Sequence, residues 1–189
     1  IVIAALLDQP WRAEHAASEL AGRLGYTPMT WSRASREIAA TGVAAIHTAG
    51  RARNLRFLQG PKETWERIRG RLRSPVKRVT LATPPHEQGK NLATRAGLSA
   101  LAAQSMLVEP QTACYAFDTA GWQAARDAGW VEQPEPDSDT AEVQVWAYRT
   151  DIAERSPNVD PISLWLSLQG TDDERVQAAL DELMEAIPW

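Results

Sequence analysis

Residues 23–42 read RLGYTPMTWSRASREIAATG, and this stretch predicts two helices that meet at a short turn. Gly25 is expected to end the first helix, because a glycine adopts the left-handed conformation without steric cost. Thr27 can cap the second helix, and Pro28 fits its first position, where the missing N–H needs no partner. Gly42 is expected to close this second helix. Two helices joined in this way are typical of a helix-turn-helix.

Outward from the turn, both helices show an apolar side. Apolar residues recur at helical spacing in residues 12–25, which predicts that this whole segment is a helix. On a wheel of the second helix, the arc expected to face the core holds Trp31, Ala34, Ser35 and Ile38. The opposite arc holds Met29, Ser32, Arg33 and Arg36, with Thr30 and Glu37 on its shoulders. Such a face can read base edges and phosphates in a major groove, although a simply solvated face remains an alternative.

The segment that follows, VAAIHTAGRARNLRFL, contains two strand-like runs around a glycine and predicts a β-hairpin. Arg51, Arg53 and Arg56 lie on its tip and returning strand. A basic hairpin after a helix-turn-helix is the order of a winged helix, in which the hairpin follows the phosphate backbone. The predicted DNA-binding residues are therefore Thr27, Met29, Thr30, Ser32, Arg33, Arg36, Arg51, Arg53 and Arg56.

Charge divides the chain into two parts. Residues 1–78 contain fourteen Arg/Lys and six Asp/Glu, a net charge of +8, whereas residues 79–189 contain six and eighteen, a net charge of −12. Such asymmetry suggests a part that binds a polyanion joined to an acidic part. We expect a winged-helix domain over 1–59, a basic helical connector over 60–78 that begins at Pro61, and an acidic domain over 79–189. The connector arginines either contact DNA or pair with acidic residues.

The acidic half predicts a compact mixed α+β domain. Its expected elements are an apolar helix over 96–107, a buried strand over 112–117, a short helix over 118–129, a strand over 141–148 and a short apolar helix over 160–168. Thr171 and Glu174 are expected to form a capping box that opens the last helix. The apolar stripe of that helix is Val176, Leu180, Leu183, Met184 and Ile187. The fold class is thus α+β, with a winged helix-turn-helix first and a mixed domain second.

Chemistry-bearing motifs are sparse. The sequence has neither GxxxxGK[ST] nor GxGxxG, and its three histidines show no metal-ligand spacing. Asp137 and Asp139 are expected to lie in a solvated loop, and Cys114 to be a buried thiol of a reducing cytoplasm. We therefore expect no enzyme, cofactor, metal site or membrane span. Further residues are expected to precede Ile1.

Three short segments of the second half stand out: Ser99, Ala100 and Leu101, then Asp160, Pro161, Ile162 and Leu164, and finally Asp173, Glu174 and Arg175. In these residues the second half resembles the C-terminal region of AbiEi-type antitoxins of type IV toxin–antitoxin systems. The resemblance implies a winged helix that represses its own promoter and a C-terminal domain that neutralises a nucleotidyltransferase-like toxin without stable toxin contact. The longer, Arg-rich connector departs from the family and leaves open a relative used only for regulation.

The leading hypothesis is a sequence-specific regulator that binds double-stranded DNA and acts as an autoregulating antitoxin. A second hypothesis keeps DNA binding but makes the acidic domain a small-molecule sensor. A third is a nucleotidyl-transferring enzyme that uses Asp137 and Asp139, and a protein-interaction module is the remaining alternative. Two copies would suit a palindromic DNA site, although nothing in the sequence fixes a dimer interface.

Overall fold

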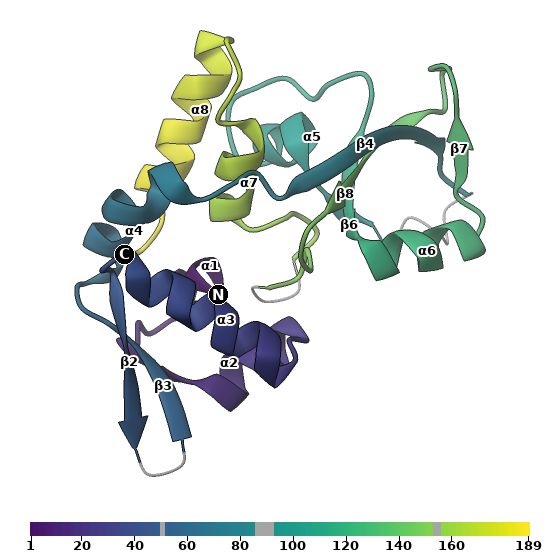
Figure 1. Cartoon of the computed structure of the whole chain (residues 1–189). Coiled ribbons are helices and arrows are strands. Elements are labelled where there is room, and N and C mark those ends of the chain that lie inside the picture. Colours follow the sequence, from purple (N-terminus) through teal and green to yellow (C-terminus); the bar gives the residue numbers. More distant parts are fainter. Residues whose placement is uncertain (50–51, 86–92, 153–155) are drawn as a thin grey trace. The chain divides into compact units, whose positions relative to one another are not determined.

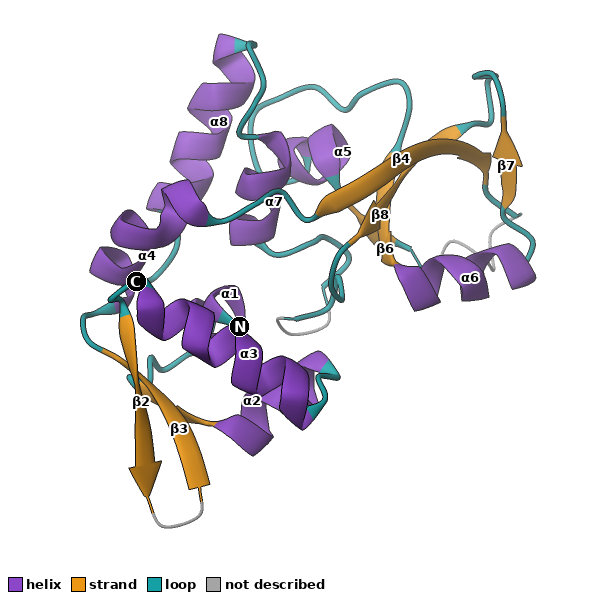
Figure 2. Ribbon diagram, in the orientation of Figure 1, coloured by secondary structure: helices purple, strands orange, loops and turns teal. Residues whose placement is uncertain are grey.

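The structure of the protein is a computed structural model, and it describes residues 1–49, 52–85, 93–152 and 156–189. The fold is mixed α+β. Within these residues the strands form a three-stranded and a five-stranded sheet. The chain folds into two compact units (Figures 1 and 2). The first unit comprises residues 1–72 and 188–189, and the second comprises residues 73–187.

The first unit contains α1 (Val2–Leu6), β1 (Glu14–Ala16), α2 (Ala17–Leu24), α3 (Pro28–Ala40), β2 (Ala44–Ala49), β3 (Ala52–Phe57), α4 (Pro61–Ile68) and a 3₁₀ turn (Arg69–Arg71). The strands are antiparallel in the order β1-β3-β2. The predicted hairpin is confirmed as β2 and β3, and Figure 1 shows it projecting beyond the helices of this unit. The predicted connector helix is α4, and it belongs to the first unit.

The first unit has buried side chains from its sheet and from α1, α2, α3 and α4. Leu20, Trp31, Leu55, Phe57 and Trp65 are among its buried side chains. The last two residues of the chain also belong to this unit. The Gln9 side chain donates a hydrogen bond to the Pro188 carbonyl (2.9 Å), and Trp189 stacks on Trp65 at 6.2 Å between ring centroids.

The helix predicted over 12–25 is partly wrong. Glu14–Ala16 forms β1, paired with residues 54–56 of β3, and α2 begins only at Ala17. A three-residue strand has no period of its own, and its partner lies about forty positions away along the chain. The helical spacing of residues 17–24 therefore extended the predicted helix over residues 14–16, where the strand lies.

The second unit contains β4 (Val76–Thr83), β5 (Thr94–Arg95), α5 (Gly97–Ala102), β6 (Cys114–Asp118), α6 (Thr119–Asp127), β7 (Val131–Gln133), β8 (Ala141–Trp146), α7 (Pro161–Leu168) and α8 (Glu174–Glu185). The strand order is β5-β6-β8-β4-β7, and β6 and β8 run parallel. β4 therefore begins inside the segment predicted as connector. The apolar helix predicted over 96–107 is shorter than expected, since α5 ends at Ala102.

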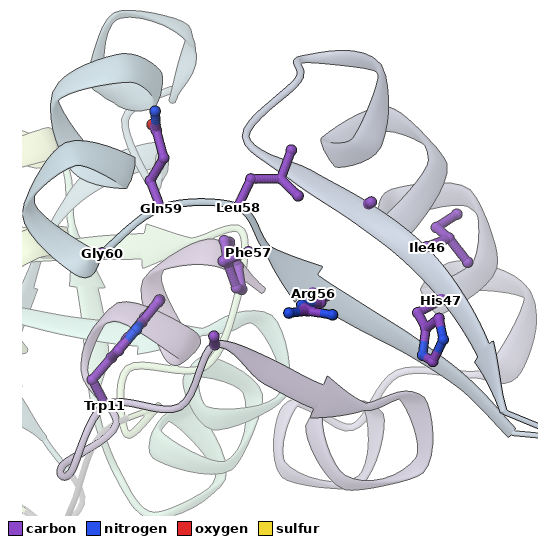
Figure 3. Close-up of a pocket in the computed structure, with 10 residues that line it drawn as sticks. Trp11, Ile46, His47, Arg56, Phe57, Leu58, Gln59 and Gly60 are labelled. Carbon is purple, nitrogen blue, oxygen red and sulfur yellow. The ribbon is translucent and has the colours of Figure 1, made fainter.

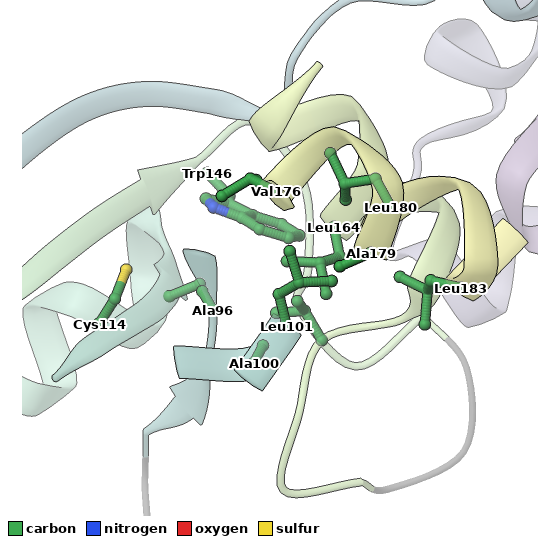
Figure 4. Packing of buried hydrophobic residues seen from close by; sticks show 12 residues of the cluster. Ala96, Ala100, Leu101, Cys114, Trp146, Leu164, Val176, Ala179, Leu180 and Leu183 are labelled. Carbon is green, nitrogen blue, oxygen red and sulfur yellow. The ribbon is translucent and has the colours of Figure 1, made fainter. Parts of the chain in front are cut away.

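Two apolar clusters cover the two faces of this sheet. Trp146 points toward α5, α7 and α8, and Figure 4 shows Leu101, Leu164 and Val176 around its ring. The other face holds a separate cluster that includes residues of α6. Of the stripe predicted for the last helix, Val176, Leu180, Leu183 and Ile187 are buried, and Met184 is partly buried.

The predicted capping box is wrong. Asp173, rather than Thr171, is the N-cap of α8, and its carboxylate accepts hydrogen bonds from the backbone N–H groups of Arg175 and Val176. Aspartate is at least as good a cap as threonine, and its charge also suits the positive end of the helix dipole.

Candidate nucleic-acid interface

Residues next to α3 in the sequence determine where this helix begins and ends. Gly25 has φ +65° and ends α2, while Gly42, with φ +77°, follows the end of α3. Thr27 Oγ1 accepts a hydrogen bond from the Thr30 backbone N–H (3.2 Å), and Pro28 occupies the first turn of the helix. The predicted order of a first helix, a short turn and a second helix is thus present as α2 and α3, with both capping features in place.

The two sides of α3 differ sharply in burial. Trp31 and Ser35 are buried, and the Ser35 hydroxyl donates to the Trp31 carbonyl (2.8 Å). Ala34 and Ile38 are only partly buried. On the opposite side Met29 is 83% exposed and the Arg33 side chain is 81% exposed. Met29, Arg33 and Arg36 are thus presented to solvent together on the outer face of α3.

Arg33 and Arg36 both point outward, and the contacts found for them lie within α3. Arg33 Nε donates to the Glu37 carboxylate (3.1 Å), and Arg36 Nε donates to the Ser32 carbonyl (3.2 Å). Glu37 is expected on the shoulder of this face, and its ion pair with Arg33, which the i,i+4 spacing allows, is an addition to that expectation. Such a pair between exposed side chains contributes only about 0.3–0.5 kcal/mol.

The smaller polar residues of the predicted site have structural roles as well. The Thr27 and Thr30 hydroxyls share a hydrogen bond (3.0 Å) at the first turn of α3. Ser32 is half-buried and lines a cleft of about 420 Å³. Of the predicted polar contacts on α3 and its cap, the side chains of Arg33 and Arg36 are therefore the ones freest to reach a ligand.

The hairpin arginines do not act as one group. Arg51 lies outside the described residues. Successive side chains of a strand point to opposite faces, so Arg53 shares a face with the buried Leu55, whereas Arg56 lies on the other face. The cleft just described joins Arg53 to α3, because Arg53, Ser32 and Pro28 all line it. The structure thus brings Arg53 to the α3 side of the sheet and leaves Arg56 on the open side.

Arg56 has acidic and polar neighbours on the open face. It lies opposite Glu14 in the β1–β3 register. The Glu14 carboxylate accepts a hydrogen bond from the Asn54 side chain (2.7 Å) and lies 3.5 Å from His47 Nδ1. The Asn54 amide, followed by His47 and Arg56, helps lower the pKa of the Glu14 carboxyl.

A cluster of ion pairs, which the sequence pattern did not predict, holds the segment before α2 against that helix. Asp8 is its centre and pairs with both Arg12 and Arg23, and Arg12 also binds Glu19. Burial by itself would raise the pKa of Asp8, but the hydrogen bonds from the two arginines outweigh it and lower the pKa. The buried His15 lies 3.5 Å from Asp8, and burial lowers the pKa of this imidazole. These contacts join the loop after α1 to α2.

Cys114 and Asp137 carry side chains that could act as a nucleophile or a metal ligand, but both are held by contacts within the second unit. Cys114 is buried, and burial, followed by the nearby Glu142 carboxylate, raises the pKa of its thiol. The Asp137 carboxylate accepts hydrogen bonds from the Thr140 hydroxyl and the Asp139 backbone N–H, which lowers its pKa. Among the described residues, no three His, Cys, Asp or Glu side chains gather as they would around a metal ion.

In comparisons with known proteins, no protein family, curated protein or solved structure matches the chain. Of the helices in the described residues, none combines the length and the apolar character that a bilayer crossing requires.

Proposed function

We propose that the first unit is a winged helix-turn-helix that binds double-stranded DNA and that the protein regulates transcription. In this proposal α3 enters the major groove and the β2–β3 hairpin follows the adjacent backbone. The order of α2, a tight turn, α3 and a hairpin supports it. The observation that carries it is the outer face of α3, where Arg33 and Arg36 stand in solvent opposite the buried Trp31.

The Arg33–Glu37 pair does not prevent this role. A bidentate arginine contact to guanine contributes about 1–3 kcal/mol of discrimination, several times the value of an exposed i,i+4 pair. DNA can therefore displace the Glu37 carboxylate from Arg33. The geometry also favours Arg53 over Arg56 as a backbone contact, because only Arg53 shares the cleft with α3.

The test starts from selection of bound duplexes out of a random-sequence pool, followed by titration of the selected site at several salt concentrations. Arg33→Ala should weaken the selected site by about 1–3 kcal/mol and relax the base preference at one position. Arg175→Ala is the matched control, since Arg175 is 84% exposed on the acidic unit and also pairs with a nearby carboxylate. Equal losses in the two variants would contradict the proposal, as would binding that salt leaves unchanged.

A second comparison separates the two hairpin arginines. Arg53→Ala should weaken all duplexes alike and reduce the slope of log K against log salt by about one. Arg56→Ala changes the net charge identically but acts on the open face, so the proposal expects a smaller effect. A larger effect of Arg56→Ala would place the DNA on the open face instead.

On the sequence resemblance alone, we also propose the autoregulating antitoxin role. Its test is co-expression with a nucleotidyltransferase-like toxin encoded beside the gene, with cell growth as the readout. Rescue of growth by the full chain supports the role. Continued growth arrest, together with intact operator binding, would leave a regulator without an antitoxin role.

One observation favours the alternative of a ligand-responsive regulator. The second unit has a pocket of about 650 Å³, open to solvent, lined by residues that include Gln111, Tyr115 and Asp139. This volume suits a small-molecule ligand, and its lining combines polar groups with an aromatic ring. A metabolite that raises the melting temperature and changes operator affinity would support this alternative. Ala113→Phe, which adds a bulky ring to the lining of this pocket, should weaken both effects.

A further inference from the structure

The outer edge of β2 is an unpaired strand edge. β2 pairs only with β3 in the described part of the chain, so its other side meets no strand there. Ala45, Ile46, His47 and Thr48 are all exposed. A strand edge of this kind presents free backbone N–H and C=O groups that can pair with another strand.

The register shows which backbone groups are free. Residues along an antiparallel pair alternate between hydrogen-bonded and non-hydrogen-bonded positions. The Leu58 N–H donates to the Val43 carbonyl (3.0 Å), so position 43 and every second position after it bond toward β3. The backbone groups of Ala44, Ile46 and Thr48 consequently point away from β3. The hydrogen bond of Phe57 supports this alternation. Phe57 lies opposite Ala44, but its N–H donates to the Ala13 carbonyl on the other side of β3, so Ala44 receives no bond from it.

β2 also lacks the features that protect other sheet edges. Natural edge strands are commonly short or charged, which discourages pairing with other chains. β1 has three residues and carries Glu14, β5 has two and carries Arg95, and β7 has three and carries Glu132. β2 has six residues, AAIHTA, without Asp, Glu, Lys, Arg, Pro or Gly. Among the described edge strands, β2 is thus the one suited to pairing.

We propose that β2 pairs antiparallel with β2 of a second copy of the chain, about a two-fold axis at Ile46. Ile46 of each copy then faces its counterpart, and Ala44 of one copy faces Thr48 of the other. Each of these positions exchanges both of its outward backbone hydrogen bonds in this register. The contact is isologous, because the same strand serves both copies.

Side chains on both faces fit this register. Residues directly opposite one another in a sheet point to the same face. The two Ile46 side chains, each 39% exposed in the single chain, cover one another on the face that bears the helices. On the open face His47 of one copy lies opposite Ala45 of the other. The small Ala45 side chain is part of the lining of a groove of about 610 Å³, which can receive the imidazole (Figure 3).

Charge favours this self-contact over approach along other surfaces of the first unit. Residues 1–72 contain eleven Arg/Lys and six Asp/Glu, and residues 188–189 have no charged side chain, so the unit carries a net charge of +5. Two such units repel one another, and like charges placed directly opposite across strands destabilise pairing. β2 brings the copies together along a strand without a fixed charge. A two-fold axis perpendicular to the sheet also leaves both Arg53 side chains on the same side.

The test measures the oligomeric state of the full chain without DNA, so that its outcome is independent of the proposed DNA binding. Sedimentation should show a reversible dimer for the natural chain. Ile46→Lys and Ile46→Glu should each raise the dimer dissociation constant roughly tenfold or more, because like charges then face one another. An equal mixture of the two variants should restore the dimer. Val79→Lys, at an exposed apolar residue of β4, is the control and should have no effect.

A cross-link tests the register itself. Paired hydrogen-bonded residues have Cα atoms about 5.5 Å apart, within the range of a disulfide. Ile46→Cys should therefore form a cross-linked dimer on mild oxidation, whereas Thr48→Cys should not. Cys114 is buried and should stay unreacted. A natural chain that stays monomeric at high concentration, a dimer unaffected by Ile46→Lys, or charge variants that fold but do not recombine would overturn the proposal.

Discussion

Replacement of Glu37 by Gln should strengthen DNA binding, although it alters no group proposed to contact DNA. In the free protein the Glu37 carboxylate accepts a hydrogen bond from Arg33 Nε at 3.1 Å, and both side chains are largely exposed. Binding must displace this carboxylate from Arg33 and then hold it near the phosphates. Both effects oppose binding, and Glu37→Gln removes the charge responsible for them.

The size of the gain follows from two contributions. Loss of the exposed ion pair releases about 0.3–0.5 kcal/mol. A carboxylate about 8 Å from a phosphate costs about 0.5 kcal/mol in water, and a Debye length of about 8 Å at physiological salt reduces this to about 0.2 kcal/mol. The sum, about 0.5–0.7 kcal/mol, corresponds to two- to threefold tighter binding. At roughly 10 mM salt the Debye length reaches about 30 Å, so the gain should grow to about fourfold.

Fluorescence anisotropy with a selected duplex measures this change. Glu185→Gln, the same replacement on an exposed residue of the acidic unit, controls for net charge. In an Arg33→Ala background the gain from Glu37→Gln should shrink to the repulsion alone, about 0.2 kcal/mol at physiological salt. Unchanged or weaker binding by Glu37→Gln, or an equal gain from Glu185→Gln, would show that the outer face of α3 does not lie against DNA.

Three further predictions concern stability and can be checked by chemical denaturation. Thr27→Ala should cost about 1 kcal/mol through loss of the α3 cap, and Thr27→Ser should retain most of it. The folded-state pKa of Asp8 is lowered, since hydrogen bonds from Arg12 and Arg23 outweigh the effect of burial. Its stabilisation is therefore complete above the unfolded pKa near 4 and is lost as pH falls through the folded value. Asp8→Asn should cost about 1–3 kcal/mol at pH 7 and progressively less as pH falls below about 4. Burial raises the pKa of Asp160, so the natural chain should lose stability relative to Asp160→Asn as pH rises from about 4 toward 7.

The elements around the site could be predicted where local chemistry decides them. Gly25, Thr27 and Pro28 act on their own turn, so their sequence pattern alone indicates the end of α2 and the start of α3. The hairpin follows from two strand-like runs close in sequence. β1 could not be found in this way, because only the distant β3 makes residues 14–16 a strand.

Which residues the fold brings together at the site was harder to predict, because this depends on tertiary packing. The alternation of a strand is enough to put Arg53 and Arg56 on opposite faces. Which of those faces the helices cover depends on the packing of α2 and α3 against Leu55, and the sequence pattern does not specify that packing. The Asp8 cluster joins residues from a loop, β1 and α2, so it too depends on tertiary structure.

The charge distribution links DNA binding to pairing through β2. One copy presents Arg33, Arg36 and Arg53 on the α3 side, and about three cationic contacts to DNA, whether to phosphate or to a base, give a salt slope of at most about −3. The chain as a whole has a net charge of −4, so little long-range attraction supplements these contacts. A second copy doubles the contacts and binds at a high effective concentration, which raises affinity without any new kind of contact.

The slope of log K against log salt tests this link. If both proposals hold, the natural chain should bind its selected duplex with a slope of about −5 to −6, and Ile46→Lys with a slope of about −3 and lower affinity. The added lysine lies at the edge of the sheet, so a direct contact with phosphate would instead make the slope of the variant steeper. Equal slopes for the two chains, measured where the natural chain is dimeric, would show that pairing through β2 does not contribute to DNA binding.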